Sequence, residues 1–275
     1  METNWILNPD GSIYHLKLKP GDLAPIILSV GDPDRVQMVS KHLDHIELQV
    51  KSREFHTITG SISGKRISIL STGIGTDNID IVMNEVDALF NIDLKTGESK
   101  EKVSKIKWIR LGTSGAIQND IPVDSILLTD WSIGADSLSD YYQPLSNQAA
   151  HMENGIRYFV FRADRDLFLK FQDSAFGIAN TFTSVGFYGP QGRSNRIRQT
   201  NLLVQLENLN LKGIGKISNL EMETSAIYCL SHLFGFQSIS VNAILANRIS
   251  GRFSKSPEKT IERMIEICFE KISGL

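Results

Sequence analysis

Residues 106–115 read IKWIRLGTSG, an apolar run that ends in two glycines flanking Thr113 and Ser114. Similar runs, rich in Ile and Val, recur along the chain and alternate with amphipathic segments. They predict strands at residues 25–30, 65–70, 106–111, 125–129, 175–183 and 237–245. Several runs are apolar on both faces, as expected of strands that helices cover on two sides. The sequence therefore predicts an α/β fold built on a central sheet.

The amphipathic segments predict helices whose apolar residues recur at helical spacing. These helices are expected at residues 77–90, 164–171, 222–234 and 257–272. Between the first helix and the next strand, the lysine-rich residues 95–107 predict a solvated loop. Because the sequence contains neither a repeat nor a linker, we expect residues 1–275 to form a single domain.

Composition excludes several classes of protein. The chain has 275 residues, of which 41% are hydrophobic and 22% charged, and its net charge is -2. No run approaches the ~20 apolar residues of a membrane span, and the polar start METNWILNPDGS is unlike a secretory signal. The two cysteines, Cys229 and Cys268, cannot form a disulfide scaffold, which favours a cytoplasmic location. Near-neutral charge argues against nucleic acid as a partner but leaves an anionic small molecule open.

Three predicted strands end in small or turn-forming residues, where α/β sheets bind ligands. The segments are GDPDR (31–35), STGIG (71–75) and GTSG (112–115). Glycines let main-chain amides approach an anion closely, but such turns are also common without a ligand. None matches GxxxxGK[ST] or GxGxxG, so nothing here supports a nucleoside triphosphate or dinucleotide.

Two later segments are compatible with recognition of a sugar and a base. Glu221 and Glu223 would share a face if extended, and a carboxylate binds vicinal hydroxyls well. Their spacing alone nevertheless favours surface carboxylates that cap the next helix. Residues 187–193, FYGPQGR, place an aromatic pair before Gln191 and Arg193. This segment is equally compatible with a base-recognition loop and with a plain surface turn.

Taken in order, the segments GDPDR, REF, STGIG, RLGTSG, FYGPQGR, EMET and NR resemble the nucleoside phosphorylase family, in particular its uridine phosphorylase branch. The resemblance covers most of the chain. It implies a single-domain, three-layer α/β/α fold with a central mixed, partly barrel-like sheet. It also implies phosphorolysis of uridine, and of deoxyuridine, to uracil and a pentose 1-phosphate in pyrimidine nucleoside salvage, which makes the enzyme a glycosyltransferase (pentosyltransferase).

The resemblance assigns residues to each part of the ligand. The phosphate would be bound by Gly31, Arg35, Arg53, Arg110 and Thr113, and the ribose by His15, Met222 and Glu223. The base would be bound by Phe187, Gln191, Arg193 and Glu221, with Arg248 supporting a uracil carbonyl. The residues expected to act directly in the reaction are Arg110, Thr113, Gln191, Arg193 and Arg248.

No organic cofactor is implied, and inorganic phosphate is the co-substrate. Some relatives hold a monovalent cation where this chain has Glu54, but Asn78 replaces the usual serine, which leaves a potassium ion open. In the family, the residues equivalent to His15 and Arg53 belong to the neighbouring subunit's site, so self-association as a dimer or hexamer is expected. Nucleic acid and membrane partners are not.

Three alternatives stay open. Purine phosphorylases and nucleosidases carry an aspartate after the late strand, where this chain reads ANRI at residues 246–249. A nucleosidase would also have little use for three phosphate-binding arginines. The third alternative is a homologue that binds nucleosides without catalysis. The chain departs from the family at Leu220, where tyrosine is usual, and at the order Gly189-Pro190-Gln191, which leaves the choice between uridine, deoxyuridine and thymidine open.

Overall fold

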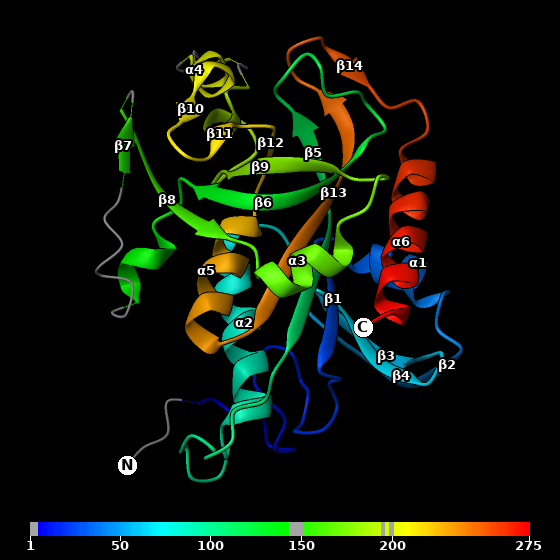
Figure 1. Cartoon of the computed structure of the whole chain (residues 1–275). Helices are drawn as coiled ribbons and strands as arrows, with labels where there is room; N and C mark the ends of the chain where they lie inside the picture. Colours follow the sequence, from blue (N-terminus) through cyan, green and yellow to red (C-terminus); the bar gives the residue numbers. More distant parts are fainter. Residues whose placement is uncertain (1–4, 143–150, 154, 194–195, 198–200) are drawn as a thin grey trace.

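The sheet is organised around β5 (Lys107–Ala116), which carries the IKWIRLGTSG motif. The structure is a computed structural model that describes residues 5–142, 151–153, 155–193, 196–197 and 201–275. β5 pairs in parallel with β1 (Ile26–Val30) and β13 (Gln237–Asn247), and antiparallel with β12 (Asn219–Glu221). β12 then pairs with β9 (Gly177–Thr183), β9 with β6 (Ile126–Gly134), and β6 with β13. These strands close a ring, so the predicted mixed, partly barrel-like sheet is confirmed (Figure 1).

Beyond β1 the sheet continues as an open extension of β4 (Lys65–Ser71), β3 (Phe55–Ile62) and β2 (His45–Ser52). β2 and β3 are joined by the two-residue turn Arg53-Glu54. Shorter strands lie at the periphery: β7 (His151–Glu153), β8 (Ile156–Arg162), β14 (Arg252–Phe253) and the pair β10 (Asn210–Leu211) and β11 (Gly215–Lys216).

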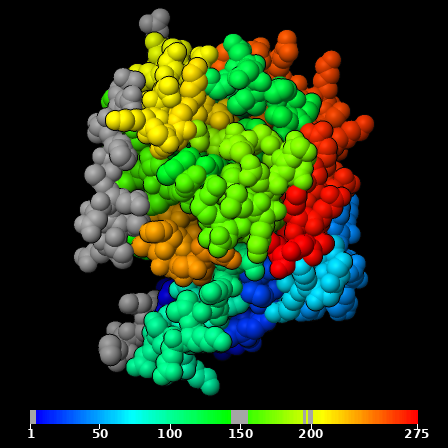
Figure 2. Space-filling model, in the orientation of Figure 1, coloured from blue at the N-terminus to red at the C-terminus, as the bar shows by residue number. Residues whose placement is uncertain are grey.

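Helices cover the sheet on two sides, which completes three layers. They are α1 (Pro33–Ser40), α2 (Thr76–Asn91), α3 (Arg165–Phe171), α4 (Leu202–Asn208), α5 (Thr224–Phe234) and α6 (Pro257–Ser273), with 3-10 turns η1 (Leu138–Tyr141) and η3 (Gly189–Gln191). α2 packs against α5, which lies on β13 and β6, while α6 packs against β13 and β5 and α1 against β3 and β4. Figure 1 shows α2 and α5 on one side and α1 and α6 on the other. α6, red in Figure 2, lies at the surface and buries its apolar stripe.

The predicted strands and helices all form, with shifted ends. The expectation that the central strand stops at Leu111 is wrong, because residues 112–116 stay in the sheet, paired with both β13 and β12. The expected helix at 222–234 starts two residues later, at Thr224. The helices α1 and α4 were not predicted, nor were the strands β2, β3, β7, β8, β10, β11, β12 and β14. β2 carries charged residues along an edge strand, so its sequence lacks the continuous apolar run of the inner strands.

Among the described residues, no helix combines the length and the apolar character that a membrane crossing requires.

Candidate active site

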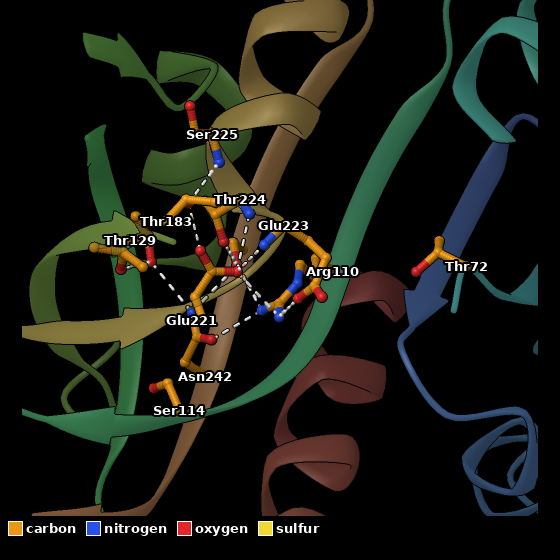
Figure 3. Close-up of polar contacts among 12 residues, drawn as sticks. Thr72, Arg110, Ser114, Thr129, Thr183, Glu221, Glu223, Thr224, Ser225 and Asn242 are labelled. Atoms are coloured by element: carbon orange, nitrogen blue, oxygen red, sulfur yellow. Dashed lines mark hydrogen bonds and ion pairs between the residues drawn. The ribbon is translucent and has the colours of Figure 1, made fainter. Parts of the chain in front are cut away.

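Arg110 lies in the middle of β5 with its side chain only 7% exposed, and a buried guanidinium needs polar partners. Its Nη2 lies 2.6 Å from Oε2 of Glu223 and 3.1 Å from Oε2 of Glu221. Its Nη1 donates to Oδ1 of Asn242, on the neighbouring strand β13, at 2.9 Å. Figure 3 shows these side chains converging from separate elements of the fold. A single guanidinium therefore holds two buried carboxylates together.

Both carboxylate oxygens of Glu221 accept hydrogen bonds from groups of the same chain. Its Oε1 accepts from the hydroxyl of Thr183 at 2.5 Å, and its Oε2 accepts from the main-chain N–H groups of Glu223 and Thr224, both at 2.9 Å (Figure 3). These bonds fix the start of α5, because the first N–H groups of a helix have no partner within it. Glu221 therefore caps the start of α5, as its spacing indicated. The expectation that Glu221 and Glu223 lie at the surface is wrong, because both side chains are buried.

Glu223 keeps a more open set of partners. Its Oε1 accepts from the main-chain N–H of Gly75 at 2.8 Å, at the start of α2, and its Oε2 faces Arg110. Burial raises the pKa of Glu223 above its usual range, while the charge of Arg110 opposes that rise. Burial disfavours the charge on Arg110, but Glu221 and Glu223 outweigh it and raise the pKa of Arg110 above its usual range. The charge of Arg110 thus favours the charged form of Glu223, and that of Glu223 the charged form of Arg110.

Gly112 makes room for the Arg110 side chain. A Cβ at Gly112 would overlap Nη1 and Cζ of Arg110 and would lie 2.8 Å from Nη2. The side chain therefore folds back over its own strand, two residues along. No residue other than glycine leaves that space free.

The other expected phosphate residues of β5, β1 and α1 lie near Arg110. Burial lowers the pKa of Arg35, on α1, and the nearby charge of Arg110 lowers it further. The charges of Asp32 and Glu223 oppose this shift. Gly31 follows β1, and a Cβ there would already touch the carbonyl oxygen of Gly73 at 3.4 Å. Thr113 is half-buried on β5, next to Gly112. These groups lie on or beside β5, whereas the guanidinium of Arg53, in the β2–β3 turn, lies against the Tyr14 ring.

The expected base residues form a second group farther along β5. Arg248 runs over Gly115, where a Cβ would lie 3.2 Å from its Cγ, and its Nη2 donates to the carbonyl oxygen of Gln191 at 3.1 Å. The guanidinium carbon of Arg193 lies 3.9 Å from the centre of the Phe187 ring. Burial, together with the charge of Arg193, lowers the pKa of Arg248 to about 10.

Within the described residues, the buried Nη1 of Arg248 has no hydrogen-bond partner. It is therefore a donor that the protein leaves for something else. Asn247, its neighbour, is in the opposite situation. The Asn247 amide donates to the carbonyl oxygens of Gln118 and Ile121 and accepts from the N–H groups of Ile249 and Ser250, so the turn uses the side chain completely.

His15 and Arg53 form a third group around Tyr14, whereas Glu54 lies beside Gly73, next to the segment that Glu223 contacts through Gly75. His15 is bound to Glu85 of α2, and the guanidinium of Arg53 lies 5.3 Å from the centre of the Tyr14 ring. Arg53 adopts a left-handed conformation, with φ of 56°, in the β2–β3 turn. Glu223 contacts α2 at its first turn, whereas Glu85 lies ten residues beyond Gly75, about 15 Å along the helix axis. The chain therefore does not bring His15 to its own Glu223.

A separate hollow of about 390 Å³ lies between β6, β8, α5 and the start of β13. Its lining includes Trp131, Arg162, Ser231 and Phe236, but none of the expected site residues. Arg162 is already paired with Asp130 there, at 2.9 Å. We therefore place the candidate site at the Arg110 and Arg248 groups along β5.

Several residues that contact the expected site residues were not predicted from the sequence. Ser240 and Asn242 are polar residues on one face of an otherwise apolar strand, a pattern that could have marked a buried polar site. Glu85 lies within the apolar stripe of α2 and is only 6% exposed, which is equally unusual for a charged residue. Gly75, in contrast, contributes only its main-chain N–H, and the residue type does not reveal that role.

Comparison with known proteins places the chain in a family. The model of the phosphorylase superfamily matches residues 25–270. A uridine phosphorylase of Thermococcus kodakarensis is 28% identical over 91% of this chain and 83% of its own length. A DeoD-type purine nucleoside phosphorylase of Oceanobacillus iheyensis is 30% identical over 94% of this chain and 98% of its own. The crystal structure of a Trypanosoma brucei nucleoside phosphorylase, which shows uridine phosphorylase activity, matches with a TM-score of 0.87 at 28% identity, covering 99% of this chain and 100% of that one. The chain belongs to the phosphorylase superfamily.

Proposed function

We propose that this chain is a uridine phosphorylase, which converts uridine and phosphate to uracil and ribose 1-phosphate and accepts deoxyuridine as a further substrate. The observation that carries the proposal is the donor-rich base end, where Arg193, Gln191 and the unpartnered Nη1 of Arg248 lie together. Uracil presents two carbonyl oxygens, and its ring gains negative charge as it leaves. Guanidinium and amide N–H groups match such a base, because they stabilise the charge that develops on it.

In this proposal Arg110, Arg35 and Thr113 bind the phosphate, and Gly31 keeps the approach open. Guanidinium groups repel one another unless an anion lies between them, which fits the lowering of the Arg35 pKa by the charge of Arg110, a smaller effect than burial. Glu223 binds the ribose hydroxyls, with the half-buried Met222 against the sugar. We assign Glu221 to positioning rather than to the base, because its oxygens are already used.

The reaction is a displacement at C1′ of the sugar. A phosphate oxygen forms a bond to C1′ as the bond from C1′ to the uracil nitrogen breaks, and that electron pair leaves with the base. The hydrogen bonds of Gln191, Arg193 and Arg248 strengthen as the base becomes anionic, so they act more in the transition state than in the ground state. Phe187 packs against the ligand beside Arg193. Positioning and electrostatics supply the catalysis.

The proposed active unit contains at least two subunits. His15 is held by Glu85 in the second half of α2, and Arg53 lies in the β2–β3 turn with its guanidinium on the Tyr14 ring, so neither is bound to Arg110 of the same chain in the described structure. Each subunit, as one domain spanning residues 1–275, would therefore lend these side chains to a neighbour's site, in a dimer or a ring of dimers. We place the enzyme in the cytoplasm, since Cys229 and Cys268 are both free thiols.

The residues around Glu54 do not fit a potassium site. Asn78 turns its amide nitrogen toward the main chain of Gly73 and Ile74, next to Glu54, and donates to the carbonyl oxygen of Ile74 at 3.3 Å. An amide N–H is a donor and cannot act as a cation ligand. Among the described residues, no group of three or more His, Cys, Asp or Glu could hold a metal ion. We therefore route no step of the reaction through a cation.

A purine nucleoside phosphorylase is the second candidate, because the Oceanobacillus iheyensis relative carries that activity in its name at 30% identity. Against it, Asn247 is consumed by its own turn and carries no acidic proton for a purine ring nitrogen. A nucleosidase is disfavoured by the arginines around the phosphate position.

The test is uridine cleavage with and without inorganic phosphate, following both uracil and ribose 1-phosphate. The proposal requires uracil release that depends on phosphate and an equal yield of the sugar phosphate. Equal uracil release without phosphate would make the protein a nucleosidase. Uridine binding by calorimetry with no turnover would make it a non-catalytic homologue.

A further inference from the structure

Glu85 of α2 holds both the main chain and the ring of His15. Its carboxylate accepts from the main-chain N–H of His15 at 3.0 Å and from that of Leu16 at 2.9 Å. The Nδ1 atom of the His15 ring lies 2.6 Å from Oε1 of the same carboxylate. The Glu85 side chain is 8% exposed, against 27% for His15. A buried acid thus anchors a histidine whose ring still reaches solvent.

This contact decides which ring nitrogen of His15 carries the proton. A carboxylate can only accept, so the Nδ1 atom must donate to it. A neutral ring with its proton on Nδ1 has a free lone pair on Nε2 and accepts a hydrogen bond there. Aromatic edges also fix the plane of the ring: Tyr14 lies 4.8 Å away and Phe55 6.5 Å away, centre to centre and nearly perpendicular.

We propose that Glu85 is a positioning residue that fixes the His15 ring with the proton on Nδ1, so that Nε2 accepts from the 5′-hydroxyl of a nucleoside in the neighbouring subunit. This inference rests on the proposed function, in which His15 contacts that ribose. A hydroxyl group can donate to this nitrogen, so the arrangement selects for a free 5′-hydroxyl. Nucleosides that lack it, and nucleotides that carry a phosphate there, lose the bond.

A glutamine at position 85 inverts this arrangement at nearly constant shape. In Glu85→Gln an amide NH₂ replaces one of the two acceptor oxygens that the N–H groups of His15 and Leu16 and the ring Nδ1 share. The side chain then no longer holds the proton on Nδ1, and we expect the ring to carry it on Nε2, which no longer accepts. Asp87→Asn is the matched control, since it also removes one carboxylate charge from α2, and the Asp87 carboxylate bonds only Asn91 in the described structure.

The first readout is the ring tautomer of His15, from ¹⁵N chemical shifts of the full-length protein. The proposal requires a proton on Nδ1 in the wild type and in Asp87→Asn, and on Nε2 in Glu85→Gln. An unchanged tautomer in Glu85→Gln overturns it. Thermal melting of each variant checks that the fold is intact.

The second readout is the ratio of kcat/KM for uridine to that for 5′-deoxyuridine, with saturating phosphate. The wild type should favour uridine by about tenfold, the value of one hydrogen bond. Glu85→Gln should reduce this preference, because the ring no longer holds its acceptor nitrogen toward the 5′-hydroxyl, and it should have no further effect in a His15→Ala background. Equal losses for both substrates would show a merely structural role and overturn the inference. Failure of the wild type to phosphorolyse uridine refutes the proposed function instead, and the tautomer still decides what Glu85 does.

Discussion

Replacing Gly112 by alanine should displace the Arg110 guanidinium from its present contacts without changing the identity of any charged residue. The added methyl group overlaps Nη1 and Cζ of Arg110, and even Nη2, at 2.8 Å, must retreat by about 0.6 Å to reach ordinary contact at 3.4 Å. Nη1 therefore leaves Asn242, and Nη2 leaves its 2.6 Å contact with Glu223. Gly112→Ala thus tests whether the position of this guanidinium matters, not only its charge.

The expected loss follows from what Arg110 does in the proposed reaction. Moving a binding group by about 1 Å can cost roughly 100-fold in rate, and removing one donor to a developing charge costs roughly 100- to 1000-fold. We therefore expect kcat/KM for phosphate to fall about 100-fold, or about 2.7 kcal/mol. The fold should also lose stability, because Glu221 and Glu223 remain buried together with a poorer counter-charge.

The assay is uracil release at fixed uridine and varied phosphate, alongside thermal melting. Gly274→Ala is the control, since a Cβ there would lie 3.5 Å from the nearest atom, in ordinary contact. A phosphate dependence within about twofold of the wild type, in a Gly112→Ala protein that is folded, would refute the assignment of Arg110 to phosphate.

Three further results are expected. Arg193→Ala should lower kcat/KM for uridine by about 100-fold through loss of a charged donor to the leaving base, with the exposed Arg196→Ala as control; a loss that falls instead on the KM for phosphate would contradict this role. Asp136→Asn should raise the melting temperature near pH 7, because burial raises the pKa of Asp136 above its ordinary 3.8 and makes the buried charge unfavourable. The wild type carries no such charge below pH 3.8 and loses stability as the pH rises through the folded-state pKa. A gain in melting temperature that persists below pH 3.8 would refute this cause. Turnover should be equal in potassium, sodium and choline chloride at one ionic strength, because Asn78 donates to the Ile74 carbonyl; a fall of about tenfold without potassium would contradict that geometry.

The inner strands and the long helices were predictable because buried strands consist of apolar runs and half-buried helices carry an apolar stripe. β5 and β13 lie between helices, and each strand carries a run of residues that is buried on both faces. The edge strand β2 has exposed residues along most of its length, so no such run exists there. The turn expected after Leu111 illustrates the limit of local patterns. Residues 112–116 are small and polar, yet pairing on both sides keeps them in the sheet.

The candidate site was predictable as a set of residue types but not as a set of contacts. Arg110, Glu223 and Arg248 were identified by resemblance, and the structure adds that Arg110 and Glu223 bind each other. Glu221 accepts from the N–H groups of the two residues that begin the next helix, whereas Glu223 accepts from one main-chain N–H, that of Gly75. The two-residue spacing of these glutamates in the sequence does not predict this difference. The separation of His15 from Arg110 follows from the length of α2, which only the assembled fold reveals.

The most direct test of the account is the base preference of the wild-type protein. Measured as kcat/KM with saturating phosphate, uridine should exceed inosine by at least about 100-fold, because the base end offers N–H donors and no acid that could protonate a purine. Inosine cleaved as fast as uridine, or faster, would contradict the assignment of Gln191, Arg193 and Arg248 to uracil.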